Sequence, residues 1–157
     1  MDAIPRQTQF SVSIQSDDFD IADETRELTS GRTNIGAVAS FIGLVRGSSE
    51  TINQMDLEHY PGMTEKSLDL ILRDAAERWP LEAARIVHRV GPLRPGDQIV
   101  LVLAASRHRQ ASFEAAEFIM DFLKTRAPFW KREHTADGAA WVDARDSDEG
   151  AVARWSR

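Results

Sequence analysis

Alternation of apolar and polar residues predicts strands in several short stretches of the chain. Phe10, Val12 and Ile14 alternate with polar residues, as in a half-buried strand. Residues 98–105 are almost wholly apolar, which is typical of a central strand. Further strands are predicted at 34–46, 52–60 and 84–90, and a hairpin at 129–133 and 139–144 around Ala136-Asp-Gly138.

Three segments between these strands have helical spacing or helix-start signals. Residues 17–29 predict a short acidic helix capped by Asp17 or Asp18. Residues 61–64 open a second helix, with Thr64 as its cap, and Trp79-Pro80 ends it. The third helix runs from about 111 to 125 and stops before Pro128. We interpret Phe129 and Trp130, just beyond it, as core residues.

Strands mixed with helices, without repeats or a linker, predict one α+β domain over residues 1–157. Residues 1–6 and about 147–157 are candidates for mobile ends, although Trp155 interrupts the polar tail. No apolar run is long enough to span a membrane and no signal peptide pattern begins the chain, so we expect a cytoplasmic protein.

Charge and residue usage narrow the chemistry. The net charge of −6 disfavours a nucleic-acid-binding protein, so any anion site must be a local cluster of cations. The absence of Cys excludes thiolate catalysis and Cys-ligated metals, and the four His show no metal-ligand spacing. We therefore expect no metal, and any sulfur must be supplied by another molecule.

Lysine is scarce, and its positions are informative. The chain has 3 Lys and 16 Arg, and Lys124 and Lys131 bracket one short segment. A lysine amine can lose its proton near neutral pH, whereas an arginine cannot. The spacing alone favours cations that decorate a helix end. It also leaves open a pair of amines that converge on one pocket from a helix end and the following strand.

A second set of cations stands at the ends of predicted elements. His108-Arg109 lies between a strand and a helix N-terminus, where backbone amides attract anions. Arg46 and Arg145 each follow a strand, and together these residues predict an anion pocket. We interpret Glu117 and Asp121 as solvated helix residues, and we assign His59 and His88 no functional role.

Several stretches resemble the large, catalytic subunit of molybdopterin synthase. They are residues 57–66, 78–81, 88–97, 106–110, 113–133 and 141–145, and the similarity runs from about Gly36 to the C-terminus. The resemblance implies an α/β hammerhead-type fold with additional antiparallel β-strands. It also implies a sulfurtransferase that converts cyclic pyranopterin monophosphate into molybdopterin and needs no cofactor.

The same resemblance implies partners. Sulfur would arrive as the C-terminal Gly-Gly thiocarboxylate of a small ubiquitin-like carrier subunit. Two copies of this chain would form a homodimer within a heterotetramer. The alternative that we carry is a non-catalytic module that binds a ubiquitin-like tail and anions without turnover.

Site residues follow from the resemblance position by position. Lys124 and Lys131 match the two catalytic lysines of the family. The positions that match substrate-binding or pocket-lining residues are Phe41, Leu44, Val45, Arg46, His108, Arg109, Met120, Arg132, Glu133 and Arg145. Two departures stand out: Leu44 occupies a position where some relatives carry Lys, and residues 47–50 lack glycines that some relatives carry.

Overall fold

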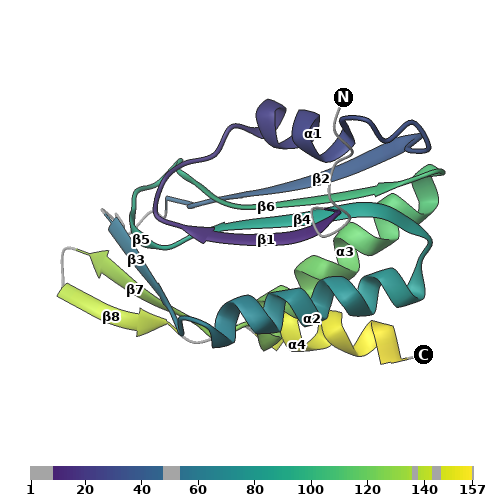
Figure 1. Ribbon diagram of the computed structural model, residues 1–157. Helices are drawn as coiled ribbons and strands as arrows, with labels where there is room; N and C mark the ends of the chain where they lie inside the picture. The colour runs from purple at the N-terminus through teal and green to yellow at the C-terminus, as the bar shows by residue number, and fades with distance from the viewer. Residues whose placement is uncertain (1–8, 48–53, 136–137, 143–145, 157) are drawn as a thin grey trace.

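Two four-stranded sheets and the helices packed on one of them make up the computed structural model (Figure 1). It describes residues 9–47, 54–135, 138–142 and 146–156. The first sheet, sheet A, has the order β1-β4-β6-β2; the second, sheet B, has the order β5-β3-β7-β8. This combination of helices with mixed and antiparallel sheets confirms the α+β prediction.

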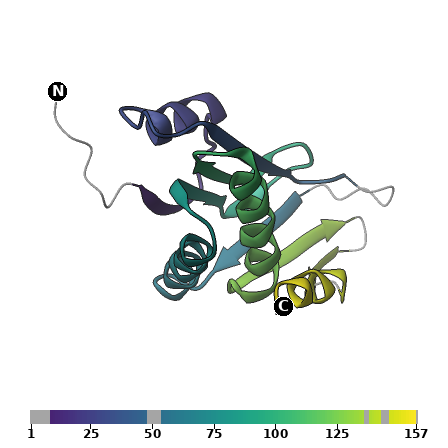
Figure 2. The same cartoon turned by 90° about the vertical axis from the view of Figure 1, so that its right-hand side faces the viewer.

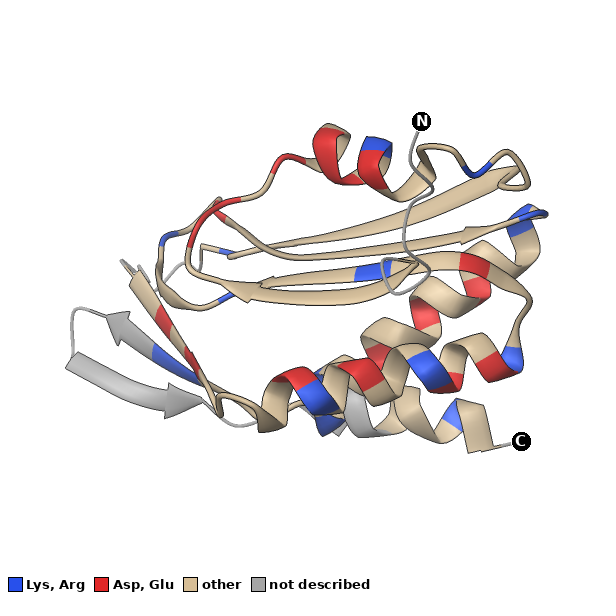
Figure 3. Cartoon of the chain, in the orientation of Figure 1, with Lys and Arg blue, Asp and Glu red and all other residues tan. Residues whose placement is uncertain are grey.

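Sheet A is mixed, because β1 runs parallel to β4 whereas the other neighbours are antiparallel. Its strands are β1 (Phe10–Gln15), β2 (Ala37–Leu44), β4 (Leu81–Arg89) and β6 (Gln98–Ser106). Residues 99–106 of β6 are all buried, as expected for the predicted central strand. Figure 3 shows few charged residues along these strands and many on the helices.

Helices cover both faces of sheet A (Figures 1 and 2). On one face α1 (Ile21–Thr29) buries Leu28 against residues such as Val87 and Leu101. On the other face, α2 (Met63–Arg78) and α3 (Arg109–Arg126) enclose the larger core with apolar residues such as Leu72 and Ile119. The alternating side chains of each strand therefore divide between two apolar layers.

Sheet B is antiparallel and lies beside the C-terminal end of α3 (Figure 1). Its strands are β3 (Gln54–His59), β5 (Gly91–Leu93), β7 (Phe129–Thr135) and β8 (Gly138–Val142). The predicted hairpin is confirmed, since β7 pairs with β8 and Thr135 lies opposite Gly138.

The helix starts differ from those predicted. Asp20 caps α1, because its carboxylate accepts from the Asp23 amide at 2.9 Å. The Asp18 carboxylate instead accepts from the Phe19 backbone N–H at 2.8 Å and from the Gln98 side-chain Nε2 at 2.9 Å. Gly62, with φ of 87°, precedes α2 in a conformation that favours glycine, and its N–H donates to Glu65. Thr64 is therefore not the cap.

The C-terminal segment forms α4 (Asp146–Ala153) and a 3₁₀ turn, η2 (Arg154–Ser156). Trp155 packs edge-on against Trp79 and Phe118, and its Nε1 donates to Asp121 at 2.6 Å. Arg154 pairs with Glu117 and Asp121, each at 2.9 Å. The interpretation of Asp121 as solvated is therefore wrong, since its side chain is only 14% exposed, whereas Glu117 is exposed as expected and still pairs with the C-terminal segment.

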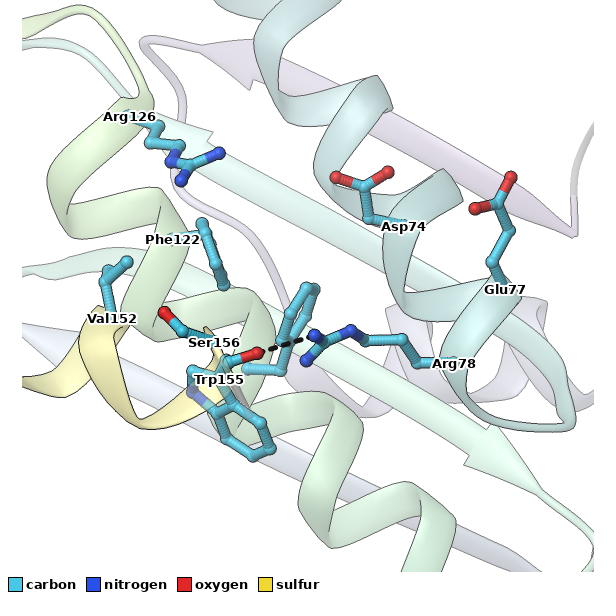
Figure 4. A pocket seen from close by; sticks show the side chains of 9 residues that line it. Asp74, Glu77, Arg78, Phe122, Arg126, Val152, Trp155 and Ser156 are labelled. Atoms are coloured by element: carbon cyan, nitrogen blue, oxygen red, sulfur yellow. Dashed lines mark hydrogen bonds between the residues drawn. The ribbon is translucent and has the colours of Figure 1, made fainter.

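A cavity of about 300 Å³ lies beside this segment (Figure 4). Its walls come from α2, α3 and the C-terminal segment, and they include Arg78, Phe122, Arg126 and Trp155. The Arg78 guanidinium closes one side by donating to the Trp155 carbonyl at 2.6 Å. None of the site residues expected from the sequence lines this cavity.

Candidate active site

Helix α3 separates the expected site residues into two groups. His108 is its N-cap and Arg109 its first residue, whereas Lys124 lies in its last turn. At a rise of 1.5 Å per residue, the backbones of Arg109 and Lys124 are about 22 Å apart. The two ends of α3 therefore cannot hold the same phosphate group within one chain.

The end of α3 that carries Lys124 also meets the strand that carries Lys131. Ala127 and Pro128 connect α3 to β7, and Lys131 is the third residue of β7, opposite Leu57 of β3. Lys124 is exposed and Lys131 is half-buried. Both amines lower the pKa of the buried His88 imidazole, so their charges act on the same part of the core.

His88 is a buried structural histidine, which agrees with the sequence analysis that assigns it no functional role. It is 5% exposed and stacks on Phe129, with ring centroids 4.0 Å apart and planes inclined by 20°. Burial is the main reason that the pKa of His88 falls from 6.5 to about 4, and Lys124 and Lys131 lower it further. Its position two residues after Ile86, on the core face of β4, was the available sequence signal.

Arg46 lies at the same end of the domain as the lysines. Strand β2 is antiparallel to β6, so that Ala37 pairs with Ser106 and Leu44 with Gln98. Arg46, two residues beyond Leu44, therefore lies at the Gln98 end, and it is exposed. Val45 is buried, and its amide donates to the Asp97 carbonyl at 2.8 Å, while its carbonyl accepts from Gly96 at 2.7 Å.

Three apolar residues expected near the substrate differ in exposure. Leu44 is 56% exposed at the end of β2, and Phe41 is 41% exposed on the same strand. Met120 is 8% exposed and packs within the larger core. Trp130 is 47% exposed, so its interpretation as a core residue is wrong, whereas Phe129 packs against the core.

The remaining expected residues follow in β7 or beyond. Arg132 is exposed and lies opposite Asp56 and Trp141 in the sheet register. The Glu133 backbone pairs with Met55 and Ala140, but its side chain lies outside the described residues. Arg145 also lies outside the described residues.

Buried hydroxyl groups hold the other end of α3. Ser106 Oγ contacts the His108 carbonyl and Ser112 Oγ, both at 2.5 Å, and Ser112 Oγ donates to the Ala37 carbonyl at 3.2 Å. A side chain at Gly36 would collide with the Arg107 carbonyl, since a Cβ there would lie 2.2 Å from that oxygen. His108 and Arg109 are exposed beside this fixed turn.

The described residues contain neither a cluster of metal ligands nor a helix suited to span a membrane. Among the described residues, no three His, Asp or Glu side chains gather closely enough to ligate a metal ion. No helix in the described ranges combines the length and apolar character that crossing a bilayer would require.

An α+β domain with Lys124 and Lys131 on either side of a two-residue connection, and with Arg46 exposed at the same end, gathers cations that suit an anionic ligand. Comparison with known proteins identifies the family: the family model described as "MoaE protein" matches residues 14–126. The chain belongs to this family of molybdopterin synthase catalytic subunits.

Individual relatives are similar over nearly the whole chain. The molybdopterin synthase catalytic subunit of Ralstonia nicotianae is 57% identical, over 92% of this chain and 84% of its own. That of Mesorhizobium japonicum is 53% identical, over 92% of both chains. The solved structure of the molybdopterin biosynthesis MoaE protein from Burkholderia ambifaria has a TM-score of 0.81 and 51% identity, and the match covers 93% and 98% of the two chains.

Proposed function

We propose that the chain is the catalytic subunit of a molybdopterin synthase, a sulfurtransferase that converts cyclic pyranopterin monophosphate into molybdopterin. The observation that carries this proposal is the position of Lys124 in the last turn of α3 and of Lys131 in β7, two residues beyond α3, in a member of the MoaE family. The absence of Cys agrees with it, because the sulfur must then come from a second molecule.

The sulfur donor is the C-terminal thiocarboxylate of a small ubiquitin-like carrier subunit. Its sulfur forms a carbon–sulfur bond on the pterin side chain in place of oxygen, twice in all. The carrier's carbonyl–sulfur bond breaks, and its acyl group ends on oxygen as a carboxylate. Sulfur thus replaces oxygen with no net gain or loss of electrons, so the conversion needs no redox cofactor.

The two lysines have different surroundings and therefore different roles. Lys124, exposed at the helix end, acts as acid–base catalyst or as a transient partner of the carrier's terminal carbonyl. Lys131, half-buried in β7, stabilises developing negative charge or transfers protons. Arg46, His108, Arg109 and Arg145 hold the phosphate and the pterin.

A complete site of this kind requires two copies of the chain. His108-Arg109 and Lys124 lie at opposite ends of α3, so one protomer supplies the lysines and the other supplies the anion-binding end. A homodimer satisfies this requirement twice, because a two-fold interface repeats each contact. With one carrier at each lysine site, the assembly is a heterotetramer located in the cytoplasm.

Single-turnover dithiolene formation with thiocarboxylated carrier tests the proposal. Lys124→Ala and Lys124→Arg both lower the rate by about 10²–10⁴, because a guanidinium keeps its proton. Lys131→Ala has a smaller effect. The matched control is Lys66→Arg, since Lys66 is an exposed lysine on α2.

Two results would contradict the proposal. Full activity of Lys124→Arg would show that charge alone suffices, and free sulfide that replaces the carrier at comparable concentration would show that no carrier is needed. Carrier and precursor binding without turnover in the wild-type protein would instead indicate a non-catalytic binding module.

A further inference from the structure

The connector between the two lysines is short and is held at both of its ends. Only Ala127 and Pro128 separate α3 from β7, and we call Pro128 and Phe129, at the start of β7, the connector. The Phe129 amide donates to the Ala127 carbonyl at 2.9 Å, which tightens the turn. The direction in which β7 leaves the turn therefore determines where Lys131 lies relative to Lys124.

Thr64 holds the first end of this connector from α2. Its side chain is fully buried, and its hydroxyl donates to the Pro128 carbonyl at 3.0 Å. The same oxygen accepts from the Tyr60 amide at 2.9 Å, so both hydrogen-bonding functions of the hydroxyl are used. Breaking this bond would leave the buried Thr64 hydroxyl without an acceptor, which costs free energy and makes the contact a restraint on Pro128.

His88 holds the second end from β4 through its stack on Phe129. Its Nδ1 lies 2.9 Å from the Arg89 carbonyl, and because a carbonyl only accepts, Nδ1 carries the hydrogen in the neutral ring. This bond fixes the orientation of the imidazole plane, and the plane fixes the Phe129 ring. Phe129 also pairs with His59 across β3 and β7.

The charges near His88 help to keep its stacked imidazole ring neutral. Lys124 from α3, Lys131 from β7 and His59 from β3 all disfavour a proton on the His88 ring. A neutral imidazole therefore supports the connector without adding a third cation beside the two amines. His59 itself has a carboxylate partner, since its Nε2 lies 3.3 Å from Glu65 of α2.

We propose that Thr64 and His88 are positioning residues that clamp the Pro128-Phe129 connector and thereby fix the separation of the Lys124 and Lys131 amines. Neither residue touches the reacting atoms; each acts through the connector. The catalytic consequence rests on the proposed function of the two lysines, whereas the positional consequence can be measured without any turnover.

The chain contains three lysines, so NMR signals from their side chains can report whether the surroundings of each one change. Lysine labelled with ¹³C at Cε gives one signal for each of Lys66, Lys124 and Lys131, and Lys66 on α2 serves as the internal control. The variants are His88→Ala, which removes the stack, and Thr64→Val, which keeps the shape and removes the hydroxyl. Their matched partners are His88→Phe, which keeps an aromatic ring, and Thr64→Ser, which keeps the hydroxyl.

The expected result is a shift of the Lys124 and Lys131 signals in His88→Ala and Thr64→Val, with the Lys66 signal unmoved. His88→Phe and Thr64→Ser restore the wild-type positions. If folded Thr64→Val or His88→Ala leaves all three signals in place, the clamp does not exist. If His88→Ala does not fold, the Thr64 pair decides, and failure of Thr64→Ser to restore the signals overturns the proposal.

Measurements of kcat and KM then test whether the position of the two lysines affects catalysis. In Thr64→Val we expect kcat to fall by about 10- to 100-fold, because small displacements of reacting groups have effects of that size. The KM for the precursor stays within about twofold, since the anion-binding residues are untouched, and Thr64→Ser restores kcat. A rise in KM alone with unmoved lysine signals would overturn the clamp. Shifted lysine signals together with a fully active Lys124→Arg would instead refute the proposed function and leave the clamp intact.

Discussion

The two ends of helix α3 are held by similar means but present different chemistry. At the N-terminal end, buried Ser106 and Ser112 fix the turn that exposes His108 and Arg109. At the C-terminal end, buried Thr64 fixes the connector between Lys124 and Lys131. In both places a buried hydroxyl holds a main-chain carbonyl, from two residues away at the N-terminal end and from helix α2 at the C-terminal end, and cations lie nearby.

The difference lies in the kind of cation and in what lies beneath it. The N-terminal end combines Arg109 with free helix amides, which suits the binding of an anion that keeps its charge. The C-terminal end has two lysines whose charges lower the pKa of the buried His88. In the proposed function one end of the helix binds the substrate and the other catalyses the reaction, and the two ends meet only if they belong to different protomers.

The largest expected effect is a recovery of activity between two impaired variants, assayed with the precursor well below its KM. Lys124→Ala removes the catalytic end and Arg109→Ala weakens the binding end, so each homodimer is impaired at both sites. When the two variants are mixed and allowed to exchange subunits, half of the dimers are mixed, and each has one intact site. Activity should recover to about a quarter of the wild-type level.

Control mixtures make this test specific. Lys124→Ala mixed with Lys131→Ala should recover nothing, because both changes lie at the same end and every mixed dimer keeps one defect at each site. Equal recovery in both mixtures, or none in either, would show that a site is not shared between protomers.

The second prediction concerns the pH dependence of stability. The unfolded His88 side chain binds a proton near pH 6.5, whereas the folded one does so only near pH 4. Between these values the unfolded state holds more protons, so the free energy of unfolding decreases as the pH falls from 6.5 to 4. The lowered pKa corresponds to about 3 kcal/mol, fully present above pH 6.5.

Denaturant titrations across this range provide the measurement. His88→Phe should flatten the decrease in unfolding free energy between pH 6.5 and 4. Asp18 does not confuse the comparison, because hydrogen bonds from Gln98 and the Phe19 amide lower its pKa below 3.8. An unchanged slope in His88→Phe would show that the histidine is not buried in its neutral form.

Some of this arrangement could be predicted from the sequence, because it depends on local patterns. The alternation in β1, the apolar run of β6 and the break at Pro128 are local signals, and the structure agrees with them. The separation of Lys124 from His108 along one helix was also readable from spacing. The resemblance treated these residues as one pocket and did not state which came from each protomer.

The remainder depends on contacts between residues far apart in the chain. The sequence predicts Thr64 as a helix cap because a hydroxyl at a helix start usually has that role. Gly62 and Glu65 cap the helix instead, and the Thr64 hydroxyl donates to the Pro128 carbonyl, 64 positions away. The stack of His88 on Phe129 and the bonds of Glu117 and Asp121 to the C-terminal segment have no local signature either.

The third prediction tests the hydroxyls at the N-terminal end of α3. Ser112→Ala removes a buried contact to Ser106 and a hydrogen bond to the Ala37 carbonyl, and it should lower the free energy of unfolding by about 1–3 kcal/mol. Thermal or denaturant unfolding measures this loss. The matched exposed serine is Ser156, where substitution by Ala should change little; equal effects would refute the structural role of Ser112.

The smallest expected effect is on ligand binding, and it compares the precursor with the carrier. Arg109→Ala should weaken binding of the pterin precursor by about tenfold, since one charge-assisted contact to an anion contributes about 1.5–3 kcal/mol when fully formed and less when exposed. Carrier binding should stay unchanged, because in the proposed function the carrier tail binds at the lysine end. The matched control is Arg107→Ala, an equally exposed arginine two residues earlier, outside the helix. Calorimetry with each ligand alone gives the comparison: equal losses for precursor and carrier, or equal losses from Arg107 and Arg109, would mean that general positive charge and not the helix terminus attracts the anion.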